Sequence, residues 1–200
     1  MTPFPPGEWS FFLVGDQWPY DEDLTAISHA KTNRGQIKTG FSIFADTLSN
    51  AQTGPLAGQQ GHTANDLHDA FRQGENHARR IAEKNSTKES AYGSAYDSTL
   101  GLQHDLTGLA EEGNKQIKEI QDSKQPVETK VAQIVALIHQ SRALASLAAA
   151  KYSGNVLDAI QRILDQEGTG QSARQFAKPT TSTLAVCSDN LTPKKPWRSM

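Results

Sequence analysis

The sequence predicts an all-α protein, an elongated antiparallel helical hairpin or bundle built from long helices. Apolar residues recur at spacings of three and four over three long segments, which is the period of one face of a helix. Short proline-containing turns separate these segments, and no stretch shows the alternation typical of a half-buried strand. Only 36% of the residues are hydrophobic, which suits long helices that each bury a single stripe.

Residues 1–19 form a lead-in that precedes the first helical pattern. Pro3, Pro5 and Pro6 prevent a regular start. The lead-in is dense in aromatic residues: Trp9, Phe11, Phe12 and Trp18. Two interpretations stay open. The aromatic residues cap apolar surface at the end of the bundle, or they form an exposed patch that contacts a partner.

The first helix is predicted over residues 21–50. Asp21 is the candidate N-cap, and the next two acidic residues favour the positive end of the helix dipole. A turn follows at Gly54, Pro55, Leu56, Ala57 and Gly58. The proline ends the first helix and folds the second back on it. Leu56 and Gly58 are expected to pack the end of the hairpin, with Gly58 allowing close approach of the two helices.

The second helix is predicted over residues 57–122. Its polar stretch at 85–91 contains Ser86 and Glu89 at capping-box spacing, so one very long helix and two collinear helices are both compatible with the pattern.

The third helix is predicted over residues 126–166, starting at Pro126 and ending before Gly168. Ile134 and Ile138 lie at the centre of its apolar stripe and are expected in the core. Residues 168–200 lose the pattern and are expected to be a disordered tail. The domains are therefore the lead-in 1–19, a helical bundle 20–167 and the tail 168–200.

The chain carries few signals of chemistry. The net charge of -2 does not indicate a nucleic-acid binder, and the single cysteine, Cys187, permits no internal disulfide. No zinc-protease, P-loop or nucleophile-elbow motif occurs, and His68 with Glu75 is too sparse to predict a metal site. No apolar run reaches the ~20 residues of a membrane span, and no basic, long-cored export signal is visible. We therefore expect an interaction module with no cofactor rather than an enzyme.

The chain resembles the WXG-type helical hairpin domain found at the N-terminus of actinobacterial type VII (ESX) secretion substrates and their toxin relatives. The resemblance covers roughly residues 9–165. It rests on the lead-in 9–16 with Trp18 and Pro19, on the acidic helix start 21–24, and on the turn. Leu56 stands where the family has tryptophan, and Gly58 matches the family's glycine.

The resemblance implies a non-enzymatic substrate, or the targeting domain of a secreted effector. Its partner would be a helical protein or the secretion machinery. Its location would be secreted or in the cell envelope, by a route that needs no signal peptide. The family's export signal is a tyrosine followed four residues later by Asp or Glu. No tyrosine here has that neighbour, although Trp18 and Glu22 have the spacing. The alternative is a cytoplasmic helical scaffold or chaperone-like protein. The oligomeric state stays open.

Overall fold

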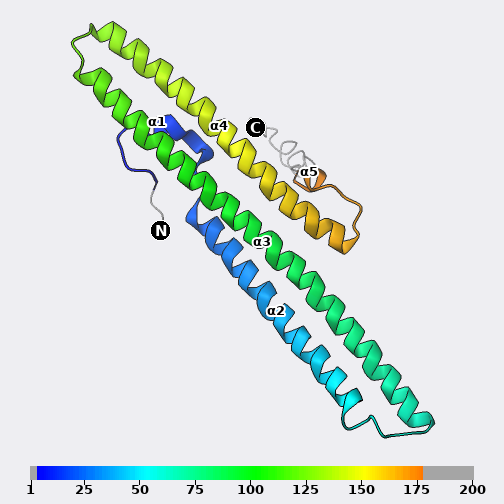
Figure 1. The fold of residues 1–200 in the computed structure, drawn as a ribbon. Helices are drawn as coiled ribbons and strands as arrows, with labels where there is room; N and C mark the ends of the chain where they lie inside the picture. Colours follow the sequence, from blue (N-terminus) through cyan, green and yellow to red (C-terminus); the bar gives the residue numbers. More distant parts are fainter. Residues whose placement is uncertain (1–3, 178–200) are drawn as a thin grey trace, which may run out of the picture.

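The computed structural model describes residues 4–177, which are helical almost throughout and contain no strand (Figure 1). The elements are α1 (Ser10–Val14), η1 (Gly15–Gln17), α2 (Asp21–Thr53), α3 (His62–Asp122), α4 (Val127–Glu167) and α5 (Ala173–Phe176). Helices α2 and α4 each pack against α3 but not against each other. Two antiparallel hairpins thus share one central helix, and the predicted elongated all-α architecture is confirmed.

Helix α3 is one continuous helix of 61 residues, so the alternative of a break at 85–91 is wrong. The polar residues there bind neighbouring helices instead of capping a new one. The ammonium group of Lys38 on α2 lies 2.6 Å from the Glu89 carboxylate. Lys84 and Lys88 pair with Glu167 at the end of α4, at 3.0 and 2.6 Å. The middle of α3 therefore presents one face to α2 and another to α4.

The turn between α2 and α3 differs from its prediction. Helix α3 begins at His62 rather than near residue 57, after Gly61, whose φ of +113° is one that L side chains rarely adopt. Gly58 is exposed, and a Cβ there would meet no atom within 4 Å, so its predicted role in close helix packing is wrong. Leu56 is half-buried, and its carbonyl oxygen lies 3.1 Å from Nε2 of His68. This hydrogen bond ties the loop to α3.

The other ends of the long helices lie within three residues of their predicted positions. Helix α2 begins at Asp21 with Tyr20 in the N-cap position, so Asp21 belongs to the first turn rather than to the cap. Pro126 is the N-cap of α4, and Gly168 ends α4 in the left-handed conformation with a φ of +67°.

The main cluster of buried apolar residues lies where the lead-in, α3 and α4 meet: Val14, Trp18, Leu106, Ala110 and Ala145. Ile134 and Ile138, predicted to be core residues, are only half-buried. The buried cluster forms instead where the lead-in adds Val14 and Trp18 to residues of α3 and α4, a contribution that the helical pattern of α4 alone does not reveal. The core therefore lies nearer the middle of α4 than predicted.

Residues 168–177 are ordered helix and turn rather than tail. Ser172 and Gln175 form a capping box at the start of α5. Ala173 is buried, and its backbone N–H donates to Oε1 of Gln161 on α4 at 2.7 Å. The predicted disorder is therefore wrong for this part, and residues 178–200 lie outside the described residues.

Candidate functional site

The lead-in is held along the side of the α3–α4 hairpin, not across the end of the bundle as the capping interpretation predicted (Figure 1). Asn114 of α3 accepts a hydrogen bond from the backbone N–H of Trp9 at 3.1 Å and donates one to Oγ of Ser10 at 2.9 Å. On the other side, Nε of Arg142 on α4 donates to the carbonyl oxygen of Phe12 at 2.8 Å. The short helix α1 is therefore anchored to both long helices.

The inward face of α1 completes the core. Leu13 and Val14 are 0% and 1% exposed. Leu13 lies directly over Gly113, where an added Cβ would come within 2.6 Å of a Leu13 methyl group. Glycine at 113 is thus what allows α1 to lie so close to α3. Trp18, 8% exposed, joins the same cluster.

The three phenylalanine rings of the lead-in, Phe4, Phe11 and Phe12, are exposed. Phe11 and Phe12 are 58% and 48% exposed, their ring centroids 6.0 Å apart. Phe4 lies 6.3 Å from Phe11, and the half-buried Trp9 lies 5.8 Å from Phe12. We call Phe4, Trp9, Phe11 and Phe12 the aromatic patch. The two interpretations of the lead-in therefore apply to different residues. Trp18 covers apolar surface as a core residue, whereas Phe11 and Phe12 are available for contact with a partner.

The turn residues lie far from the aromatic patch. The loop between α2 and α3, at one extremity of the molecule (Figure 1), contains Gly54, Pro55, Leu56 and Gly58. The patch lies beside residue 114 of α3, about 75 Å away along that helix at 1.5 Å per residue. The structure does not bring the two sets of predicted site residues together, so they cannot form one site within a single chain.

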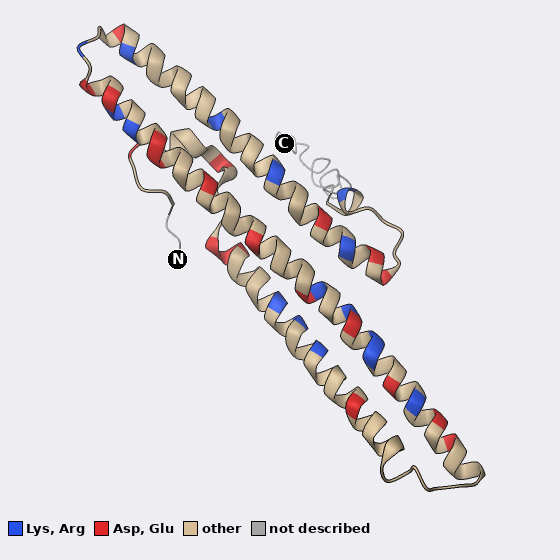
Figure 2. Cartoon of the chain, in the orientation of Figure 1, with Lys and Arg blue, Asp and Glu red and all other residues tan. Residues whose placement is uncertain are grey.

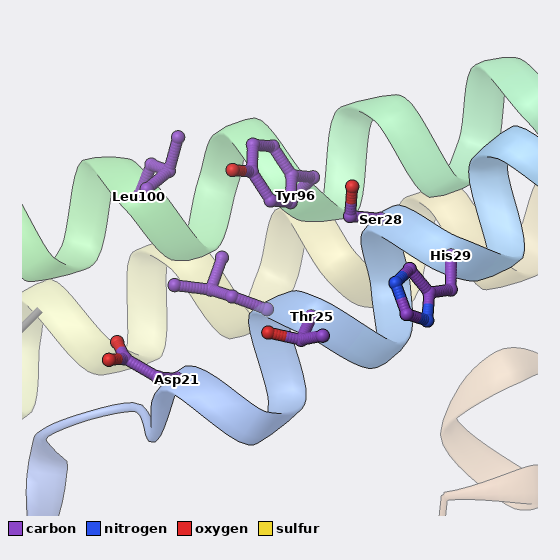
Figure 3. Close-up of a pocket in the computed structure, with 7 residues that line it drawn as sticks. Asp21, Thr25, Ser28, His29, Tyr96 and Leu100 are labelled. Carbon is purple, nitrogen blue, oxygen red and sulfur yellow. The ribbon is translucent and has the colours of Figure 1, made fainter. Parts of the chain in front are cut away.

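A shallow pocket of about 270 Å³ lies between the first turns of α2 and the middle of α3 (Figure 3). Its lining from α2 includes Asp21, Thr25, Ser28 and His29, and its lining from α3 includes Tyr96 and Leu100 on the opposite side. Asp21 and His29 are at opposite ends of the view, about 12 Å apart along the axis of α2. They are too distant for the direct hydrogen bond that an acid–base pair requires.

The described residues provide neither a group of metal ligands nor a membrane-spanning helix. Within residues 4–177, no three His, Cys, Asp or Glu side chains are grouped to hold a metal ion. His68, part of the most metal-like group in the sequence, binds the loop carbonyl instead. None of the described helices is both long and apolar enough to cross a bilayer.

Sequence reasoning did not identify Asn114 and Arg142 as the residues that hold the lead-in. Their partners are 105 and 130 residues away in the chain, so no local pattern connects them. The one available signal was the polar Asn114 following Gly113 within an otherwise apolar stripe.

Comparison with known proteins gives one informative relative. The chain is 35% identical over 164 residues to the uncharacterized protein Rv2082 of Mycobacterium tuberculosis. The match covers 81% of this chain but 22% of the relative, so the chain spans about a fifth of the protein it matches. No family model and no solved structure matches the chain.

Proposed function

We propose that this chain is a non-enzymatic helical interaction domain of type VII secretion, acting as a substrate or as the targeting domain of a secreted effector. The observation that carries the proposal is the aromatic patch. Its Phe11 and Phe12 rings are 58% and 48% exposed, while the helix that carries them is fixed by the buried Leu13 and Val14. Rigid aromatic side chains on an anchored backbone lose little entropy on binding, and such residues are enriched at interfaces.

Two further observations support this assignment. The hairpin and lead-in resemble those of the actinobacterial secretion substrates, and the relative is a mycobacterial protein. The long exposed faces of α2, α3 and α4 offer the kind of surface on which a partner helix packs through apolar positions at helical spacing.

The structure bears on how export would be signalled. Trp18 and Glu22 have the spacing of the family's signal, but Trp18 is buried against Leu106 and Ala145. A receptor cannot read a buried ring without unfolding the lead-in. We therefore propose that a bound partner carries the signal and that this chain leaves the cell in complex with it.

Export can be tested with the tagged full chain in its native host. Culture filtrate and lysate are compared between strains with and without a functional type VII secretion ATPase. We expect the chain in the filtrate only when the ATPase is active. Equal amounts in both filtrates, or retention in both lysates, would contradict the proposal.

The role of the aromatic patch is tested with a Phe11→Ala/Phe12→Ala variant in the same strains. The matched control is Leu147→Ala, because Leu147 is 67% exposed on α4 and is not part of the patch. We expect the patch variant to fold but to lose export, and the control to be exported normally. A patch variant exported at the wild-type level would show that these rings are not the contact.

The second candidate is a cytoplasmic scaffold or chaperone-like protein. The observation that favours it is the absence of a tyrosine with the export spacing in the sequence. It would be supported by ATPase-independent retention of the chain in the cytoplasm in a stable complex.

A further inference from the structure

The lead-in and the start of α2 carry negative charge alone. Residues 4–30 contain no lysine or arginine, and their acidic residues are Glu8, Asp16, Asp21, Glu22 and Asp23. Figure 2 shows red on the lead-in and on the first turn of α2, with the first blue residues farther along α2. Within residues 4–177, no ion pair involves Glu8 or Asp16. This region therefore attracts positively charged groups.

The aromatic patch lies inside this acidic region. Glu8 directly precedes Trp9, and Asp16 follows α1. At the other side of the patch, the ring centroid of Phe4 is 5.7 Å from that of Trp18, and the acidic start of α2 is only two residues farther along the chain. Exposed rings flanked by carboxylates are complementary to a ligand that carries both rings and positive charge.

Residues 193–198 have this complementary chemistry. They read Pro-Lys-Lys-Pro-Trp-Arg and lie outside the described residues. No acidic residue occurs from 191 to 200, and Trp197 is the only aromatic residue of the chain after Phe176. Proline-rich segments dock on aromatic side chains. Tryptophan and arginine side chains both stack on aromatic rings.

The chain is long enough for this segment to reach the patch. Helix α5 is fixed beside Gln161 of α4 by the hydrogen bond from Ala173, and the hydrogen bond from Arg142 marks the position of α1 on the same helix. Residues 142 and 161 are about 28 Å apart along α4. The chain from Phe176 to residue 193 spans up to about 56 Å when extended. This length is about twice the separation, so the segment can also pass around α4.

We propose that residues 193–198 bind across the aromatic patch of the same chain, with Trp197 against Phe11 and Phe12 and the basic side chains facing the carboxylates of the lead-in and α2. The consequence of this contact rests on the proposed function, because it covers the surface assigned to the partner. A partner must then displace the segment in order to bind. The contact is intramolecular, so it does not depend on protein concentration.

Fluorine NMR of the full chain labelled with 5-fluorotryptophan tests the contact. The chain has three tryptophans, and the resonance lost in Trp197→Phe is that of Trp197. At low salt we expect this resonance to be displaced from its position in urea, by the same amount from about 10 to about 500 µM protein. A resonance at its urea position would overturn the proposal. A displacement that grows with concentration would assign the contact to a second copy and overturn it as well.

The place of the contact is tested with the Phe11→Ala/Phe12→Ala variant. We expect its Trp197 resonance to return to the urea position, while circular dichroism shows that the helices are retained. The matched control is Val131→Ala/Val135→Ala, a second exposed pair that lies on α4 outside the patch, and it should leave the resonance unchanged. No response to the patch variant, or an equal response to both, would contradict binding at the patch.

The role of charge is tested by reversal and by salt. Glu8→Lys/Asp16→Lys should release Trp197, whereas Glu119→Lys/Glu128→Lys, the same change in net charge at exposed positions outside the lead-in, should not. Raising the salt from about 0.01 to about 1 M shortens the Debye length from about 30 to about 3 Å and should release Trp197 progressively. A contact insensitive to both changes would overturn the proposal.

These measurements use purified protein and separate the two proposals. A chain that keeps the Trp197 contact but is not exported contradicts the proposed function alone. A chain that is exported normally but lacks the contact contradicts this inference alone.

Discussion

Two glycines of α3, seven residues apart, should respond in opposite ways to the same substitution. A Cβ at Gly108 would meet no atom within 4 Å. A Cβ at Gly101 would lie 2.6 Å from Cε1 and 3.0 Å from Cζ of the Tyr152 ring on α4. Gly108→Ala should therefore stabilise the protein, whereas Gly101→Ala should destabilise it.

The expected magnitudes follow from these contacts. Alanine is favoured over glycine in a helix by about 1 kcal/mol, which is the gain expected at Gly108. At Gly101 the ring must move by about 1 Å to reach an ordinary contact distance. Overpacking of this kind costs about 1–3 kcal/mol. The movement also strains the 2.8 Å hydrogen bond from the Tyr152 hydroxyl to Asp105, and a bond to a charged group contributes about 1.5–3 kcal/mol. The propensity gain applies at both positions, so the two variants should differ in unfolding free energy by the cost of the clash and of the weakened hydrogen bond, about 2–5 kcal/mol.

Urea denaturation followed by circular dichroism measures the difference as a shift in midpoint at an unchanged slope. Tyr152→Ala, alone and combined with Gly101→Ala, completes a double-mutant cycle. Because removing the ring removes the clash, Gly101→Ala should cost less stability in the Tyr152→Ala background, and the difference is the coupling energy between the two positions. If Gly101→Ala stabilises as much as Gly108→Ala, α4 does not pack on α3 at Tyr152, and the α3–α4 hairpin described here is wrong.

The helices were predictable because each carries its own evidence in the sequence. The period of 3.6 residues and the turns at Pro55 and Pro126 depend on neighbouring residues alone. The shared role of α3 was not predictable in the same way. Many of its buried residues are small, such as Ala82 and Ala95, and small residues give a weak periodic signal.

The candidate site was only partly predictable. The aromatic character of the lead-in marked Phe11 and Phe12, but no local pattern shows that Trp18 is buried while they are exposed. That division depends on contacts with residues about a hundred positions away. Gly58 illustrates the opposite error. A glycine in the sequence does not indicate whether the space beside it is filled by a neighbouring helix, as at Gly101, or by solvent.

Three further predictions test the core, a buried polar group and an ion pair. Leu106→Ala should lower the unfolding free energy measured in urea by about 3–5 kcal/mol, because Leu106 is 0% exposed where the lead-in, α3 and α4 meet. The exposed control Leu147→Ala should lower it by less than about 0.5 kcal/mol. Equal costs for the two variants would contradict this core. Asn85 is 7% exposed, and its Oδ1 accepts no hydrogen bond within the described residues, so Asn85→Leu should raise the unfolding free energy by about 1 kcal/mol. A loss of stability would show that the hydrogen bond from its Nδ2 to the carbonyl oxygen of Ile81, 2.8 Å, outweighs the unpaired oxygen. The hydrogen bonds from Lys88 and Lys84 lower the pKa of Glu167 from 4.5 to about 2. Because the folded-state pKa lies below the ordinary value, this contact stabilises the end of α4 above pH 4.5, and its contribution is lost as the pH falls towards about 2. The difference in melting temperature between the wild type and Glu167→Gln should therefore shrink over that interval. A difference that stays constant from pH 5 to pH 2 would show that the carboxylate is not paired with the two lysines in solution.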